Sequence, residues 1–246
     1  MILADLHTHT RYSDGKGSIE QTVLAAREKG LKQVGITEHG FRHIAFGVHR
    51  ADLYRERIEV DRLREKYPDI EILLGIEANI FCSKGLLDLK PYDLKILDYV
   101  VAGYHMAMLP KDPLDFCRYN LMGLIKIKRP SDKQRALFTK VFVEAIKQKG
   151  VKIISHIGYA LPVDVAQVAQ AAYDYGVMME LNGKKVSLTD KEVYTLTSSK
   201  AKIIANSDAH SPNRVGDVSV PLALLDRLGI DKNILVNWNK KVVFEK

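Results

Sequence analysis

ILADLHTH, residues 2–9, indicates the fold, because a short apolar run ends here in His7 and His9. Short apolar runs bounded by turn residues are typical of buried parallel strands. In parallel α/β folds the catalytic groups lie beyond the carboxyl ends of the strands, so we expect such endings to meet in one site. Six later runs follow the same plan: QVGITEH (33–39), EILLGIE (71–77), YVVAGYH (99–105), KIISH (152–156), GVMMELN (176–182) and KIIANSDAH (202–210).

Helix signals separate these runs. Ser18 to Gln21 has capping-box spacing before an apolar stripe, and Gly30 is placed to end that helix. Alternating strands and helices imply right-handed crossovers and a parallel sheet. Seven strands that deliver residues to one centre favour a closed or nearly closed barrel, since a flat sheet would spread their ends over roughly 30 Å. Other helices are predicted from about Asp52 to Tyr67, from about Ser131 to Lys149, and from starts at Pro162, Thr189 and Pro221.

Composition agrees with one domain over residues 1–246, because 246 residues with 46% hydrophobic content can bury a full core. Cys82 and Cys117 form no CxxC, which argues against a disulfide scaffold. We expect no signal peptide, since the first strand begins at Ile2, and no membrane span, since no apolar run approaches 18 residues. These features predict a cytoplasmic protein without membrane contact.

The net charge of +7 comes from widely spread basic residues, and a charge excess of this kind most simply favours solubility. One local cluster could attract an anionic substrate, or it could be a solvated helix surface. No block of five like charges is present, so no arm for nucleic acid is predicted. The cluster comprises Lys126, Lys128, Arg129, Lys133 and Arg135.

The histidines indicate a metal site. Residues i and i+2 of a strand point to the same side, so His7 and His9 can bind one ion, and Asp208 and His210 repeat the spacing. Six of the eight histidines end predicted strands, and we predict that all six bind metal. They are His7, His9, His39, His105, His156 and His210. His43 and His49 fall in a loop and are expected to be solvated or to face the substrate.

The acidic residues divide in the same way. Glu77 ends an apolar strand, and a carboxylate there would be costly unless it met a cation, so Glu77 is predicted to bridge metals. Asp14 lies in an SDG sequence, where turn formation and metal ligation are equally open. Glu38 is expected to support the ligands from behind. Glu180 is expected either to do the same or to be a hydrogen-bonded group inside the barrel.

Six ordered motifs, DLHTHTxxSDG, ITEHG, GIEANI, GYH, ISHIG and SDAH, resemble those of the PHP (polymerase and histidinol phosphatase) family of metal-dependent phosphoesterases. The resemblance runs from Asp5 to about Gly216. The spacing, and GIEANI in particular, is most similar to YcdX-like phosphatases and to PHP domains attached to family X DNA polymerases. The resemblance implies a distorted, TIM-like (β/α)7 barrel, in agreement with the strand runs.

The same resemblance implies up to three metal ions. His7, His9, Glu77 and Asp208 would hold the first, and Glu77, His105 and His156 the second. Asp14, His39 and His210 would hold the third, although close relatives carry histidine in place of Asp14. Such ligands suit zinc, the preferred prediction, and also manganese or iron.

The predicted reaction is hydrolysis of a phosphomonoester of a small metabolite by water activated between metals. Three divalent ions bring +6, and three carboxylates and one hydroxide return −4, which leaves about +2 to bind a phosphate dianion that resists anionic attack. Besides Glu77, the predicted catalytic residues are His43, as a proton donor, and Arg42 and Arg214. The two arginines would bind phosphate oxygens, or would instead form surface pairs at the rim.

Three alternatives stay open at this point. A nuclease or phosphodiesterase could use the same metals, but no aromatic platform is interleaved with the basic cluster. An amidohydrolase-like deacylase is disfavoured because the fourth strand ends in His105, where a bridging carboxylated lysine would be needed. A non-catalytic module is disfavoured by the complete ligand sets. Neither the leaving group nor the oligomeric state is predicted.

Overall fold

Parallel strands form the centre of the molecule in a computed structural model that describes residues 1–125 and 130–244. The first three strands form one sheet in the order β1-β2-β3, and the other five form a second in the order β4-β5-β6-β7-β8. Their bounds are β1 Ala4–Asp5, β2 Gln33–Ile36, β3 Glu71–Leu74, β4 Glu77–Asn79, β5 Val100–Gly103, β6 Val151–Ile154, β7 Met178–Asn182 and β8 Lys202–Asn206.

Each of the eight strands overlaps one of the seven predicted runs, because the run from 71 to 77 covers β3 and reaches the first residue of β4. The division falls at Gly75, where a Cβ would lie 2.8 Å from both Thr37 and Tyr99, so only glycine fits between the two strands. Single bridges join the remaining edges: His39 pairs with Glu77, and Thr8 pairs with Ala209. These links confirm the prediction of a distorted α/β barrel.

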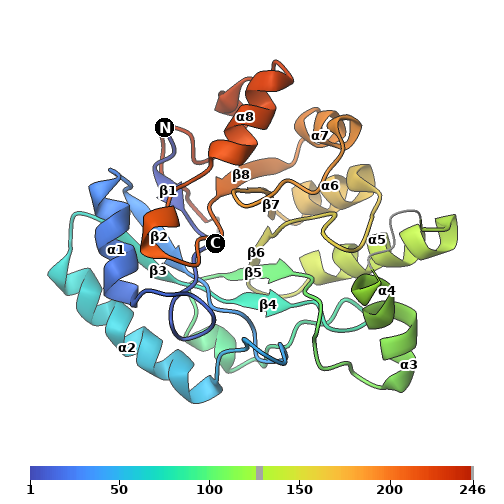
Figure 1. The fold of residues 1–246 in the computed structure, drawn as a ribbon, viewed down its shortest axis with the longest axis horizontal. Coiled ribbons are helices and arrows are strands. Elements are labelled where there is room, and N and C mark those ends of the chain that lie inside the picture. The colour runs from blue at the N-terminus through green and yellow to red at the C-terminus, as the bar shows by residue number, and fades with distance from the viewer. Residues whose placement is uncertain (126–129, 245–246) are drawn as a thin grey trace.

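Helices surround the strands in Figure 1. Capping boxes at Ser18, Ser131 and Thr189 start three of them, and Gly30 and Gly150 adopt positive φ after helix ends, as predicted. Pro221 lies in the first turn of its helix, also as predicted. The longer helices are α1 Ile19–Glu28, α2 Arg50–Lys66, α5 Asp132–Ile146, α6 Val165–Asp174, α7 Asp190–Thr197 and α8 Ser219–Arg227.

One predicted helix start is wrong, and one connection contains helices that were not predicted. Helix α6 does not begin at Pro162, because the Asp164 side chain accepts a hydrogen bond from the Gln167 amide and sets the start at Val165. The connection after β5 contains α3 Pro113–Asp115, the π-helix Phe116–Asn120 and α4 Leu121–Leu124. Short 3₁₀ turns occur at Asp93–Lys95, Pro212–Arg214 and Lys232–Ile234.

The core has two parts, and their residues alternate along several of the strands. Residues such as Val34, Ile72 and Ala102 face the helices, whereas Leu6 and Tyr99 belong to a smaller cluster inside the barrel. The chain after α8 closes one end of this interior. There Phe244 stacks on Tyr99 at 5.0 Å, and Asn237 donates hydrogen bonds to the Ala4 and Ala205 carbonyls. The opposite end, where β1, β5, β6, β7 and β8 terminate, remains for the site.

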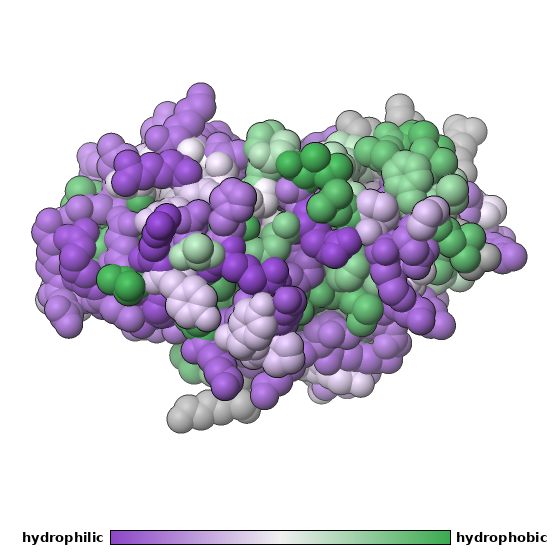
Figure 2. Space-filling view, turned by 90° about the horizontal axis from the view of Figure 1, so that it is seen from below, coloured by the Kyte–Doolittle hydropathy of each residue, from purple (hydrophilic) through white to green (hydrophobic). Residues whose placement is uncertain are grey.

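The surface in Figure 2 is mainly hydrophilic on its left, and hydrophobic side chains gather on its right, the side of α3 and α4 in Figure 1. Leu114 and Ile125 are among the exposed apolar residues of this connection. Within residues 1–125 and 130–244, no helix is both long enough and apolar enough to cross a membrane.

Candidate metal centre

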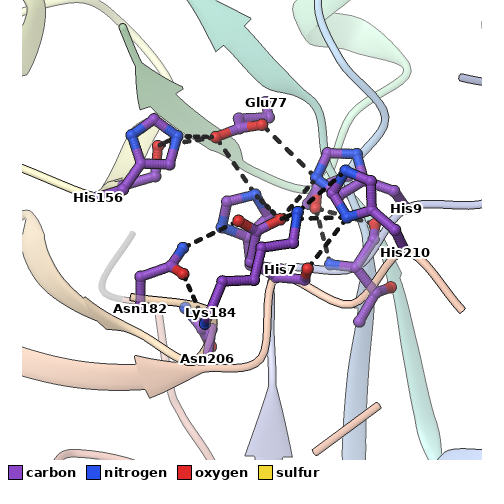
Figure 3. Close-up of polar contacts among 12 residues, drawn as sticks. His7, His9, Glu77, His156, Asn182, Lys184, Asn206 and His210 are labelled. Atoms are coloured by element: carbon purple, nitrogen blue, oxygen red, sulfur yellow. Dashed lines mark hydrogen bonds and ion pairs between the residues drawn. The ribbon is translucent and has the colours of Figure 1, made fainter. Parts of the chain in front are cut away.

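The carboxylate of Glu77 faces several imidazole rings, among them those of His7, His9 and His156 (Figure 3). Glu77 is the first residue of β4 and is only 1% exposed. Ser155 donates a hydrogen bond to its Oε1 at 2.9 Å. Five histidines, which follow four different strands, each place a ring nitrogen within 3.5 Å of a Glu77 oxygen: His7 (3.3 Å), His9 (3.5 Å), His39 (3.0 Å), His105 (3.1 Å) and His156 (2.8 Å).

Asp208 approaches the same centre from the segment after β8. Its Oδ1 lies 3.3 Å from His9 Nε2 and 3.8 Å from His7 Nε2, which agrees with the first predicted ligand set. Asp208 holds a left-handed conformation with φ of 51°. The buried Asp5 carboxylate fixes this segment by accepting hydrogen bonds from Ser207 and from the Gly216 amide. Strain that the surroundings impose in this way is typical of functional sites.

A second group of donors lies beside the first, at the surface of the centre. Asp14 Oδ1 is 3.4 Å from His39 Nε2 and 3.2 Å from His210 Nε2. The SDG sequence also makes its turn, since the Gly15 amide donates to the Thr10 carbonyl. Asp14 therefore forms the turn that the sequence left open, and its position opposite two histidines leaves metal ligation as a prediction.

Unpartnered polar atoms show that these residues fit metal ions. A buried atom without a hydrogen-bond partner is costly, and such atoms concentrate here. Three overlapping sets of donor atoms lie within 4.8 Å of one another: His7 with His9 and Glu77; His39 with Glu77 and His105; and His9 with Asp14, His39 and His210. Buried atoms without a partner include His7 Nε2, His9 Nδ1 and Nε2, Asp14 Oδ1, His39 Nδ1, Glu77 Oε2 and His105 Nε2.

Hydrogen bonds behind the rings fix their orientation. His7 Nδ1 lies 2.8 Å from Glu180 Oε1, so a proton on Nδ1 leaves Nε2 free to face Glu77 and Asp208. Glu180 also accepts bonds from Asn206 and Asn182, and it is therefore a fully hydrogen-bonded group inside the barrel, as expected.

The same arrangement orients His105. Its Nδ1 is 2.8 Å from Asn79 Oδ1, and Asn79 donates to the buried Asp88. The sequence analysis missed Asn79, although it follows Glu77 by two residues and so shares its side of the strand.

Glu38 supports the loop that carries Asp14. Its carboxylate accepts bonds from the Thr10 amide and hydroxyl and from the Ser13 hydroxyl, which confirms the expected supporting position. Burial, only partly offset by these bonds, raises the pKa of Glu38 to about 7.

The pKa values of the centre are set by burial, which disfavours charge, and by neighbouring groups of opposite charge, which favour it. Burial tends to raise the pKa of Glu77, but the charges of His105 and His7 and hydrogen bonds from histidines outweigh it and hold that pKa well below the usual range. Burial tends to lower the pKa of His39, but Asp14 and Glu77 outweigh it and raise that pKa to about 9. Burial dominates at His105 and lowers its pKa to about 4. Glu77 is therefore ionised and His39 protonated at neutral pH in the metal-free protein.

Metal affinity should consequently fall as the pH is lowered. A metal binds neutral imidazole, so it must displace the proton of His39 at every pH below about 9. We expect the affinity of the set that contains Asp14, His39 and His210 to fall about tenfold for each pH unit between 8 and 6. Calorimetric zinc titrations at pH 6, 7 and 8 would measure this slope and the protons released. An affinity independent of pH, with no proton release, would contradict the assignment of His39 as a ligand.

A cavity of about 280 Å³ opens onto the centre. Its lining includes Asp14, Glu77, Asp208 and four of the predicted histidine ligands, together with His43, Phe46, Tyr159, Lys184, Lys185 and Ser187. The His43 ring stacks between Phe46 and His39, at 5.0 and 5.5 Å between ring centres. His43 Nδ1 accepts a hydrogen bond from the Phe46 amide, so the neutral ring carries its proton on Nε2.

Comparison with known proteins agrees with this geometry. The PHP domain family model matches residues 5–184. A probable phosphatase of Thermoanaerobacter sp. (strain X514) is 32% identical over 246 residues, covering 96% of this chain and 90% of the relative. The chain belongs to the PHP family. A second relative, a probable phosphatase of Shewanella sp. (strain ANA-3), is 30% identical. The match covers 95% of this PHP chain and 86% of the relative.

Solved PHP-like structures share the fold. A histidinol phosphate phosphatase from Lactococcus lactis, complexed with zinc, L-histidinol and phosphate, covers 93% of this chain and 94% of its own with a TM-score of 0.60 and 13% identity. The match to a putative histidinol phosphatase from Listeria monocytogenes covers 87% of this chain and 97% of the Listeria chain. Its TM-score is 0.65 and the sequence identity is 16%. The predicted family and enzyme class, a metal-dependent phosphoesterase, are confirmed.

The two arginines predicted to bind phosphate do not line the cavity of this PHP chain. The guanidinium of Arg42 lies over the Phe81 ring at 4.5 Å and donates to the Leu109 and Pro110 carbonyls. Arg214 forms an ion pair with Asp217 at 2.5 Å. Both therefore follow the alternative of residues that have local partners outside the cavity lining.

His49, Lys133 and Arg135 also lie away from the cavity lining. His49 is exposed and precedes α2. Lys133 and Arg135 are on α5, where Arg135 donates to the Val163 carbonyl. Lys126, Lys128 and Arg129 lie outside the described residues. The sequence analysis instead missed Lys184 and Lys185, because their position beside the centre depends on a turn after β7.

Proposed function

We propose that this PHP protein is a phosphomonoesterase that hydrolyses a small phosphorylated metabolite with three divalent metal ions. One observation carries the proposal: the buried Glu77 carboxylate has five imidazole nitrogens within 3.5 Å. A structural carboxylate would not need so many partners, whereas a carboxylate that bridges metals would meet the ligands of both. The relatives named as probable phosphatases support the same reaction.

The proposed ligands divide among three positions around Glu77. His7, His9 and Asp208 would share Glu77 at the first position, and His105 and His156 at the second. Asp14, His39 and His210 would make the third. The bound metals would lower the pKa of a water molecule and offset the charge of the phosphate. Imidazole with carboxylate suits zinc, and a solved PHP-like neighbour contains it.

The remaining catalytic task is to protonate the leaving alkoxide, and we assign it to His43. This ring lines the cavity, and its Nε2 carries the proton in the neutral state. Burial and the neighbouring His39 lower the pKa of His43. To act as the general acid, His43 would have to be in its imidazolium form, whose proton the lowered pKa makes more acidic but less populated at neutral pH.

The cavity favours a small substrate over a polymer. Its volume of about 280 Å³ lies at the lower limit of ordinary small-molecule sites, which begin near 300 Å³. A nuclease would need an extended basic groove with aromatic rings for stacking bases. A cytoplasmic location and membership of the YcdX-like subgroup stay predictions.

A metal analysis combined with a phosphatase screen tests the proposal. We expect about three metals per chain, hydrolysis of p-nitrophenyl phosphate with zinc, manganese or iron, and much slower hydrolysis of bis(p-nitrophenyl) phosphate. Faster hydrolysis of the diester would identify a phosphodiesterase instead. A metal-loaded protein that cleaves neither ester would overturn the proposal.

A further inference from the structure

Two lysines, Lys184 and Lys185, follow β7 and line the cavity. The Lys184 ammonium lies 3.3 Å from Asp208 Oδ1 and 3.2 Å from His210 Nε2 (Figure 3). Lys185 also lines the cavity, is exposed, and makes no ion pair within the described part of the chain. One wall of the cavity therefore carries two positive charges in addition to those of the metals.

The turn that carries these lysines is tied to the centre. Asn182 Oδ1 accepts hydrogen bonds from the amides of Lys184 at 2.9 Å and Lys185 at 3.4 Å. The Asn182 amide group donates in turn to Glu180 and to Asp208. A Cβ at Gly183 would lie 2.5 Å from the Asp217 carbonyl oxygen, so only glycine fits between Asn182 and Lys184. The backbone of the two lysines is consequently held in place at the wall of the cavity.

The charges of the cavity do not balance when only a phosphate is bound. Its lining includes three carboxylates among the described residues, Asp14, Glu77 and Asp208, and each already contacts histidines. Three divalent ions and two lysines bring about +8, whereas these carboxylates and one hydroxide return −4. A phosphate dianion lowers the remaining charge to about +2. An apposed negative group on the substrate would meet this excess, and a positive group would be repelled.

From this imbalance, which rests on the function proposed above, we propose that the substrate is a phosphomonoester whose leaving group carries a second acidic group. A carboxylate or a second phosphate would both suit Lys185. Histidinol, the alcohol bound by the Lactococcus neighbour, carries an ammonium group. In this cavity that positive group would be repelled by the two lysines. Lys185 is then a specificity-determining residue, and the preference of this enzyme differs from that of a histidinol phosphatase.

Three phosphomonoesters separate these substrates: 3-phosphoglycerate, with a carboxylate; glycerol 3-phosphate, with an uncharged leaving group; and histidinol phosphate, with an ammonium. For the wild-type holoenzyme we expect kcat/KM to be at least about tenfold higher for 3-phosphoglycerate than for glycerol 3-phosphate, and lowest for histidinol phosphate. The variant K185M should lose about tenfold of this preference, mainly through KM. Lys191 is exposed on α7 and does not line the cavity, so K191M serves as the matched control and should keep the preference.

Equal or greater activity on histidinol phosphate would overturn the inference and leave the phosphatase proposal intact. So would a preference for 3-phosphoglycerate that K185M keeps unchanged. If the metal-loaded protein hydrolyses no ester at all, the proposed function fails. In that case calorimetric binding of the same compounds decides the inference, since tighter binding of 3-phosphoglycerate that is lost in K185M would still support an acidic ligand. Metal content is measured for each variant, so that a change in occupancy is not mistaken for a change in specificity.

Discussion

Replacing Glu77 with glutamine is expected to remove most of the bound metal and to lower kcat/KM for p-nitrophenyl phosphate at least about a thousandfold. The change keeps the size of the side chain but removes its charge. Histidines from four different strand ends then lose the anion that lies within 3.5 Å of each. Metal content by elemental analysis and steady-state kinetics in saturating zinc measure the two effects.

Glu56 provides a matched control for this substitution. It is fully buried on α2, and neither carboxylate oxygen has a hydrogen-bond partner among the described residues. Burial raises the pKa of Glu56 well above its usual value, which favours the neutral form that glutamine resembles. E56Q should therefore keep the metal content and activity of the wild type. Normal metal content and turnover in E77Q would remove Glu77 from its assigned position.

Metal removal is expected to lower the melting temperature by roughly 8–16 °C. A ligand at a thousand times its dissociation constant stabilises the folded state by about 4 kcal/mol, and 1 kcal/mol moves the melting temperature of a chain of this size by about 2–4 °C. The physical reason is the concentration of buried, unpartnered donor atoms at His7, His9, His39 and Glu77, which metal ions would satisfy. Circular dichroism melts in excess EDTA and in saturating zinc measure the difference.

Calcium gives the control for this melt, because it prefers oxygen ligands and should not replace zinc among imidazoles. Adding zinc back to the EDTA-treated protein should restore the melting temperature, and adding calcium should not. Identical melts in EDTA and zinc would show that the histidine cluster is stable without metal and is not a metal centre.

Local sequence patterns determined the strand runs and most helix starts, because periodicity and capping depend on neighbouring residues. The capping boxes at Ser18 and Thr189 are formed as the sequence indicates. The i and i+2 spacing likewise indicated that His7 and His9 face one side, and they do lie together, with ring centres 5.1 Å apart. Where two local signals competed, prediction failed: the Asp164 cap, rather than Pro162, set the start of α6.

Strand ends also predicted which residues meet, since parallel strands bring their carboxyl ends to one face. Glu77 is the exception, because it begins β4 and does not end a strand as predicted. All nine predicted ligands lie in the one centre or at its cavity. Sequence position alone could not show that Lys184 and Lys185 line the cavity whereas Arg42 and Arg214 do not, because all four residues lie close to a motif. The Phe81 ring and the Leu109 carbonyl engage Arg42, and these partners come from distant segments.

The sequence by itself therefore determined the barrel, the family and which histidines and acidic residues meet at the centre, because local periodicity and side-chain chemistry can be read in order along the chain. Only the tertiary structure decided that Asn79 orients His105, that Glu180 orients His7, and that Lys184 reaches Asp208. Each of these contacts joins residues 24 or more positions apart. Such contacts depend on how strands pair around the barrel, and no pattern within one segment contains that information.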